Sequence, residues 1–69
     1  MTRKHLRQAR EKAGLSQEDL AHAVGTTQQT YRSAELAERS IKLDLALSIA
    51  ERLGYDVTAL RRLFAVVER

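Results

Sequence analysis

The stretch that decides the fold runs from Leu15 to Glu35 and reads LSQEDLAHAVGTTQQTYRSAE. Ser16 is a typical helix N-cap, and Asp19 follows three residues later, where a capping box places an acidic or amide side chain. Glycine 25 interrupts the helical pattern, and glycine tolerates the positive φ that a sharp turn requires. The stretch therefore predicts two short helices joined by a tight turn at Gly25.

The second of these helices carries polar side chains on its outward face. Thr27 is its predicted N-cap, and its predicted inward side consists of Tyr31, Ala34 and Glu35. The residues on or beside the outward face are Gln28, Gln29, Arg32 and Ser33. A glutamine side chain holds a donor and an acceptor in one plane, which matches the major-groove edge of adenine. This arrangement predicts a helix-turn-helix spanning about residues 16–36, with its second helix in the major groove of DNA.

The rest of the chain predicts further helices and no strand. The spacing indicates a helix over about 3–13 that ends at Gly14, and Asp56 is the predicted cap of a last helix over about 57–68. Between them, an apolar stripe at helical spacing ends at Gly54 and consists of Leu43, Ala46, Leu47, Ala50 and Leu53. We expect an all-α fold of five short helices in a single domain over 1–69.

Composition narrows the function classes. The chain has no cysteine and two separated histidines, His5 and His22, so we expect no disulfide, metal site or cofactor. We find no acid–base pair and no phosphate-cradling loop in the sequence, so we do not expect an enzyme. The apolar runs are short, so we expect no membrane span and a cytoplasmic protein.

The net charge of +3 is unevenly distributed. Residues 1–12 carry five Lys or Arg against one Glu, and further cations follow at Arg32, Arg39 and Lys42. Such clustering suits contact with phosphates, although a solvated helix face would explain the charge equally well. The basic N-terminal residues are open to two interpretations, an arm that reaches DNA or a frayed first helical turn.

The chain resembles the Xre-type helix-turn-helix family of lambdoid phage repressors and Cro proteins. The resemblance extends from Leu6 to about Leu60 and centres on LSQEDLA-x-x-VG. It implies a five-helix, repressor-like DNA-binding domain from a prokaryote or phage that acts at the nucleoid. The run RSIKLD, residues 39–44, is closer to the controller proteins of restriction–modification systems.

The resemblance also implies roles for individual residues. Gln17 matches a position that anchors a phosphate at a helix N-terminus, and Arg10 and Glu35 match a buried salt bridge. The positions that match the groove-facing set are Thr27, Gln28, Gln29 and Ser33. From the helical pattern itself we add Arg32 as a base or phosphate contact, and from the clustering of basic charge we add Arg39 and Lys42 as phosphate contacts.

The residues after Glu35 depart from this family. Members usually continue with Asn-Gly and a basic loop that ends in Pro, whereas this chain continues with LAERSI, residues 36–41. The absence of glycine and proline here leaves the second helix of the motif free to extend past Glu35. Such an extension would reshape the phosphate-contacting loop.

The last predicted helix has a wider apolar face than one core contact requires. It either closes a small core or packs against a second copy of the chain, and we favour the second interpretation. The residues expected at this dimer interface are Tyr55, Leu60, Leu63, Phe64 and Val67. The expected partners are therefore a palindromic double-stranded operator and a second protomer, with no small-molecule ligand.

Two function classes remain. The first is a homodimeric transcriptional regulator, which could be a phage repressor, a restriction–modification controller or an autoregulating antitoxin. The second is a protein-interaction module, or an antitoxin that acts mainly by binding a protein. Acidic or apolar residues on the outward face of the second motif helix would favour the second class.

Overall fold

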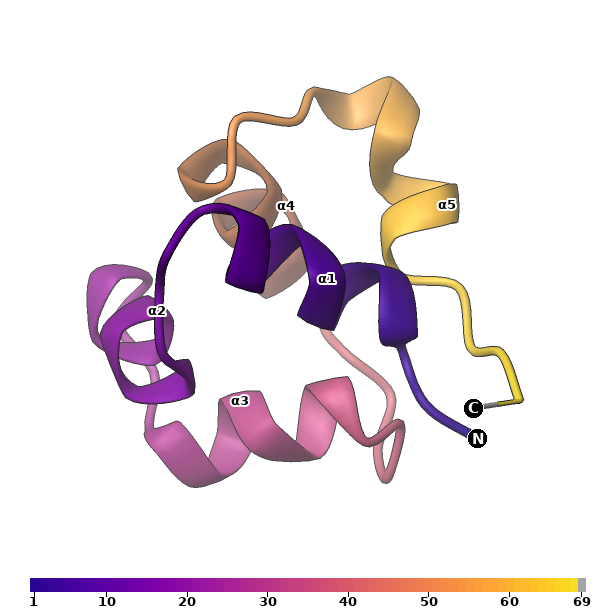
Figure 1. The fold of residues 1–69 in the computed structure, drawn as a ribbon, viewed down its shortest axis with the longest axis horizontal. Helices are drawn as coiled ribbons and strands as arrows, with labels where there is room; N and C mark the ends of the chain where they lie inside the picture. The colour runs from indigo at the N-terminus through magenta and orange to yellow at the C-terminus, as the bar shows by residue number, and fades with distance from the viewer. Residues whose placement is uncertain (69) are drawn as a thin grey trace.

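The computed structural model describes residues 1–68, and these residues form a small helical globule (Figure 1). The elements in chain order are α1 (Lys4–Lys12), α2 (Gln17–Ala23), α3 (Gln28–Glu35), α4 (Leu43–Arg52), the 3-10 helix η1 (Val57–Ala59) and α5 (Leu60–Leu63). In place of a sheet, the described residues contain an isolated antiparallel bridge between Thr2 and Val67. The all-α prediction is confirmed. Within residues 1–68, no helix has the length and apolar character needed to cross a membrane.

The predicted helix caps are present. The Ser16 hydroxyl accepts from the Asp19 N–H at 2.9 Å, and the Ser16 N–H donates to the Asp19 carboxylate at 3.3 Å, which completes a capping box. Thr27 caps α3 by accepting from the Thr30 N–H at 3.1 Å. Asp56 accepts from the Thr58 N–H at the start of η1. Side chains close in sequence thus set where these helices begin.

The turn between α2 and α3 depends on Gly25. Its φ is +77°, and the N–H groups of Gly25 and Thr26 donate to the carbonyls of His22 and Ala21. This is a Schellman motif, which supplies hydrogen-bond donors to the otherwise free carbonyls at the end of α2. An added Cβ would meet nothing within 4 Å, so the backbone angle, and not lack of space, favours glycine here.

The end of α3 differs from the prediction. The helix stops at Glu35 and does not extend, because Ala37 adopts a φ of +57°. The N–H groups of Ala37 and Glu38 donate to the carbonyls of Ala34 and Ser33, at 3.2 and 3.0 Å. Alanine thus occupies the left-handed position that glycine usually fills in a Schellman motif.

The core lies where α1–α4 and α5 meet. Its largest fully buried side chains are Leu6, Leu20, Tyr31 and Ile49. The prediction for α4 was partly wrong, because Leu43 is 65% exposed while Ile49 is buried and Leu45 packs against the core. Leu43 is the first residue of α4 and lies before the helix reaches the core.

The C-terminal helix is shorter than the predicted 57–68. Residues 57–59 are 3-10, α5 ends at Leu63, and the chain then runs back beside its own start (Figure 1). Thr2 and Val67 exchange two backbone hydrogen bonds of 2.8 Å each. The Phe64 carbonyl, which a continuing helix would use internally, accepts from the Arg3 side chain at 3.1 Å. These contacts with the N-terminus replace further helical turns.

Candidate nucleic-acid interface

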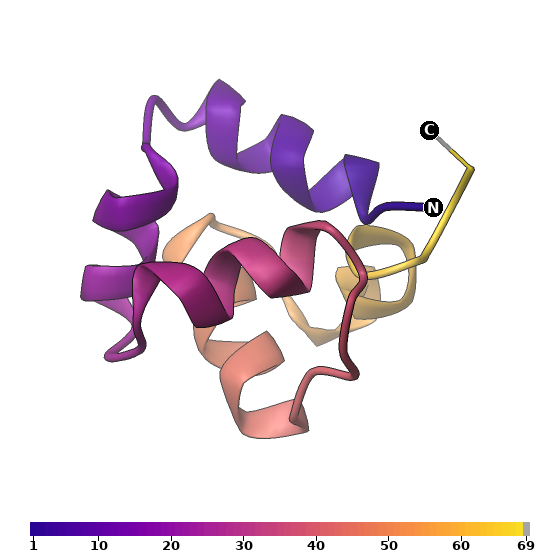
Figure 2. The same cartoon turned by 90° about the horizontal axis from the view of Figure 1, so that it is seen from below.

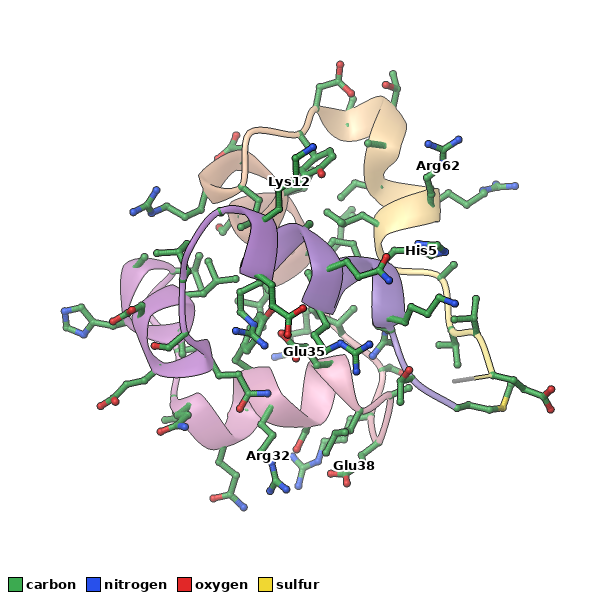
Figure 3. All side chains as sticks on the ribbon, in the orientation of Figure 1. His5, Lys12, Arg32, Glu35, Glu38 and Arg62 are labelled. Atoms are coloured by element: carbon green, nitrogen blue, oxygen red, sulfur yellow. The ribbon has the colours of Figure 1, made fainter. Side chains whose placement is uncertain are left out.

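One side of α3 is open to solvent along its whole length. Figure 2 shows α3 lying across the face of the molecule, with no other helix in front of it. Gln28, Gln29 and Arg32 are exposed, and Arg32 points away from the body of the protein (Figure 3). Figure 3 shows Glu35 on the opposite side of the helix, toward α1. The structure therefore separates a polar, outward side of α3 from its packed side.

The other two expected base contacts are already engaged within the protein. The Thr27 hydroxyl caps α3 and also donates to the Thr30 hydroxyl at 2.8 Å. Ser33 is half-buried, and its hydroxyl donates to the Glu38 carboxylate at 3.3 Å. Gln28, Gln29 and Arg32 are therefore more available for a new partner than Thr27 or Ser33.

The loop after α3 brings a cation onto the same face. A depression of about 270 Å³ is lined by Thr27, Gln29, Thr30, Ser33 and Arg39. Arg39 also lines a second hollow of about 340 Å³, together with Lys42 at the start of α4. The expected phosphate contacts Arg39 and Lys42 thus border the exposed side of α3, because the turn at Ala37 directs the loop back along the helix.

The same turn places an acidic residue on this face. Glu38 is exposed and lies with Arg32 on the outer side of α3 (Figure 3). It was not among the residues expected from the sequence, because a Schellman motif without glycine gives no recognisable sequence signal. A carboxylate at this position repels phosphates and can accept a hydrogen bond from the amine of cytosine.

Three helices meet at the carboxylate of Glu35. Arg10 from α1 donates to it through Nε at 2.5 Å and through a terminal nitrogen at 3.4 Å, and Gln17 from α2 donates at 3.2 Å. The Arg10 and Glu35 side chains are only 11% and 4% exposed. The hydrogen bond to Glu35 raises the pKa of Arg10, so the guanidinium keeps its positive charge. The cluster holds α3 in a defined orientation against α1 and α2.

Gln17 therefore has a structural partner in this protein. Its side-chain nitrogen carries two hydrogens, and one of them is directed to Glu35. The second hydrogen and the backbone N–H at the start of α2 are the groups that could meet a phosphate.

Tyr31 lies on the packed side of α3, so its hydroxyl is not placed to contact a phosphate. Its side chain is fully buried, and within residues 1–68 its hydroxyl has no hydrogen-bond partner. Burial raises the pKa of this hydroxyl well above its ordinary value, and the neighbouring Glu35 raises it further. The predicted packing role agrees with this placement.

Arg3 has a role that neither interpretation of the basic N-terminus anticipated. It is 7% exposed, and its guanidinium donates to the carbonyls of Ala34, Phe64 and Arg39 at 2.6, 3.1 and 3.3 Å. Burial lowers its pKa. Arg3 is thus neither part of a free arm nor frayed. No sequence signal distinguishes it from the exposed Arg7.

The residues expected at a dimer interface are unequally accessible. Leu63 is a core residue, only 4% exposed, whereas Leu60, Phe64 and Val67 are half-buried and Tyr55 is 36% exposed. Val66, which was not expected there, is 42% exposed beside Val67. Any contact between protomers at α5 must use this half-buried surface.

Comparisons with known proteins agree with this geometry. The model of a protein family described as helix-turn-helix matches residues 6–60 of this chain. An uncharacterized HTH-type transcriptional regulator from Methanothermobacter thermautotrophicus is 44% identical over 51 residues, which is 74% of each chain. No solved structure matches the chain.

Proposed function

The chain belongs to the Xre-type helix-turn-helix family of DNA-binding transcriptional regulators, and we propose that it binds a palindromic operator as a homodimer. In this proposal α3 enters the major groove and the protein acts as a repressor or controller at the DNA of a prokaryotic cell or a phage. The exposed side of α3, with Gln28, Gln29 and Arg32, is the observation that carries the proposal.

Base reading is assigned to the first two residues of α3. Docked helix-turn-helix proteins direct the N-terminal end of the recognition helix at base edges. Gln28 and Gln29 occupy that end, and a glutamine pairs bidentately with adenine. Arg32, one turn further along, reaches either guanine or a phosphate. Thr27 and Ser33 border these contacts.

Phosphate contacts are assigned to both flanks of α3. Arg39 and Lys42 lie beside it on the loop side, and Gln17 lies at the start of α2. Because one amide hydrogen of Gln17 bonds Glu35, a phosphate held by its second hydrogen would be linked to the cluster that orients α3. Backbone contacts of this kind fix the register in which the bases are read.

Dimerisation is assigned to the surface around α5. Leu60, Phe64 and Val67 are half-buried, and the proposal includes the exposed side chains of Tyr55 and Val66 with them. Leu63 supports it from the core. A two-fold dimer would place two α3 helices about 34 Å apart, one helical turn of DNA.

The decisive experiment is selection of bound sequences from a random duplex pool, combined with sedimentation of the free protein. The proposal expects an enriched palindrome and a concentration-dependent dimer. Recovery of a single half-site from a purely monomeric protein would refute the dimer while leaving base reading intact.

One observation favours a second candidate function. Glu38 places a negative charge on the outward side of α3, and an acidic residue there suits a protein partner better than a polyanion. In this alternative the chain is an interaction module or antitoxin that acts mainly through a protein partner. Failure of the selection to enrich any sequence would count against the first candidate and favour the second.

A further inference from the structure

A groove separates α1 from the C-terminal segment. Its volume is about 290 Å³, close to the lower limit for small ligand pockets. His5, Ala9 and Lys12 line it from α1, and Tyr55, Arg62 and Leu63 line it from the other side. The groove is independent of the surface assigned to DNA.

The groove lies away from α3. In Figure 3, His5, Lys12 and Arg62 are in the upper half of the molecule, whereas Arg32 and Glu38 lie at the bottom, beyond α3. None of the residues expected to contact bases or phosphates lines the groove. A molecule bound there would leave α3 free to bind DNA.

The chemistry of the groove is apolar at its floor and cationic at its rim. Ala9 and Leu63 are buried core residues, and the Tyr55 ring adds a further apolar wall. Lys12 and Arg62 place two cations at the rim, beside His5, and no acidic side chain lines the groove. Within the described part of the chain, the ion pair that the structure contains joins Arg10 to Glu35, so the rim cations have no carboxylate partner.

We propose that this groove binds an acidic segment of a partner protein that presents one or two apolar side chains between carboxylates. The apolar side chain enters between Leu63 and Tyr55, and the flanking carboxylates meet Lys12 and Arg62. Hydrophobic grooves bind the apolar anchors of a segment, and clusters of basic side chains recognise acidic motifs. The proposal goes beyond DNA binding and does not depend on it.

The two other macromolecular occupants fit the groove less well. The dimer surface proposed above centres on Leu60, Phe64 and Val67, and none of these residues lines the groove. Duplex DNA would neutralise the rim but leave the apolar floor unfilled, because its backbone presents only charged and polar groups. An acidic segment with an apolar anchor satisfies both parts of the groove.

The test uses the whole chain and a fluorescein-labelled ten-residue peptide of Asp and Glu around a central Leu-Phe pair. Fluorescence anisotropy should show saturable binding that weakens as salt rises. Arg62→Glu should weaken binding about tenfold, because it replaces an attraction at the rim with a repulsion. Arg61→Glu is the matched control, since Arg61 is the neighbouring exposed arginine and does not line the groove. Circular dichroism should show that both variants fold.

Each alternative gives a different result. A second peptide with Ser-Ser in place of Leu-Phe should bind at least about tenfold more weakly. Equal binding of the two peptides, or equal losses in the two arginine variants, would show a general charge effect and overturn the proposal. Competition by random duplex DNA would assign the site to nucleic acid and also overturn it. If neither peptide binds, the groove proposal is also overturned, while the DNA-binding proposal remains to be decided by the selection experiment.

Discussion

The guanidinium of Arg3 donates to the carbonyl of Ala34 at 2.6 Å and so connects the start of the chain to the last turn of α3. A cation at a helix C-terminus meets the negative end of the helix dipole. The same group also holds the carbonyls of Arg39 and Phe64. Through Arg3, the end of α3, the following loop and the segment after α5 are tied to one another.

Replacement of this side chain should be costly. We expect Arg3→Leu to lower the free energy of unfolding by roughly 3 kcal/mol, because it leaves three carbonyls without their charged donor. Urea denaturation measures the change. Arg7→Leu is the control, since Arg7 is exposed on α1 and its replacement should change stability by less than about 0.5 kcal/mol. Equal effects of the two substitutions would contradict the role assigned to Arg3.

Ala37 offers a stabilising substitution. Its φ of +57° disfavours any residue with a Cβ, so Ala37→Gly should raise the free energy of unfolding by about 1 kcal/mol. In a domain of this size that corresponds to a rise in Tm of about 4–8 °C. Ala13→Gly should not stabilise, because Ala13 ends α1 with a φ of −80°. A lower Tm for Ala37→Gly would show that the left-handed turn carries no strain.

The unpartnered Tyr31 hydroxyl leads to a prediction about alkaline pH. Its pKa is raised in the folded state, so above about pH 10 only the unfolded chain releases this proton readily. Stability should therefore fall as the pH rises above 10, and Tyr31→Phe should remove part of that fall. At pH 7 the same variant should be as stable as the parent or more stable, because it removes a buried polar group without a partner.

Thermal melts between pH 7 and 11 provide the measurement for Tyr31. Tyr55→Phe is a suitable control, because it removes the same hydroxyl from an exposed side chain. The interpretation fails if Tyr31→Phe loses stability at pH 7, since the hydroxyl must then have a partner that stabilises the fold.

Gln28 should affect specificity more than affinity. Loss of a bidentate contact to adenine costs about 1–3 kcal/mol of discrimination at one base pair. Gln28→Ala should therefore relax the selected sequence at one position in each half-site and preserve salt-dependent binding to random DNA. Gln8→Ala, an exposed glutamine on α1, should change neither property. Equal losses on operator and random DNA would refute the assignment.

Glu38 should oppose binding to DNA in general. We expect Glu38→Gln to raise affinity for random duplex DNA about threefold at low salt, since it removes one charge that repels phosphates. Electrophoretic mobility shifts at several salt concentrations measure the effect. Glu51→Gln removes an equivalent exposed charge from α4 and should have a smaller effect. Weaker binding of Glu38→Gln to one preferred sequence alone would instead indicate that Glu38 reads a base.

Much of the fold could be predicted because its signals are local. Ser16, Thr27 and Asp56 bond N–H groups only two or three residues away, so their effect is visible in a short stretch of sequence. Gly25 marks its turn through a backbone angle that few other residues adopt. The outward position of Gln28, Gln29 and Arg32 followed from helical periodicity alone.

What the sequence determined by itself is therefore the helices from α1 to α4, the turn at Gly25 and the polar side of α3. Only the tertiary structure decided the positions of Arg3, Glu38 and residues 64–68. The Arg3 side chain donates to carbonyls that lie 31, 36 and 61 residues away in the sequence, and Val67 forms an antiparallel bridge with Thr2. Such contacts depend on segments that approach one another only after folding, and no local pattern of residue types records them.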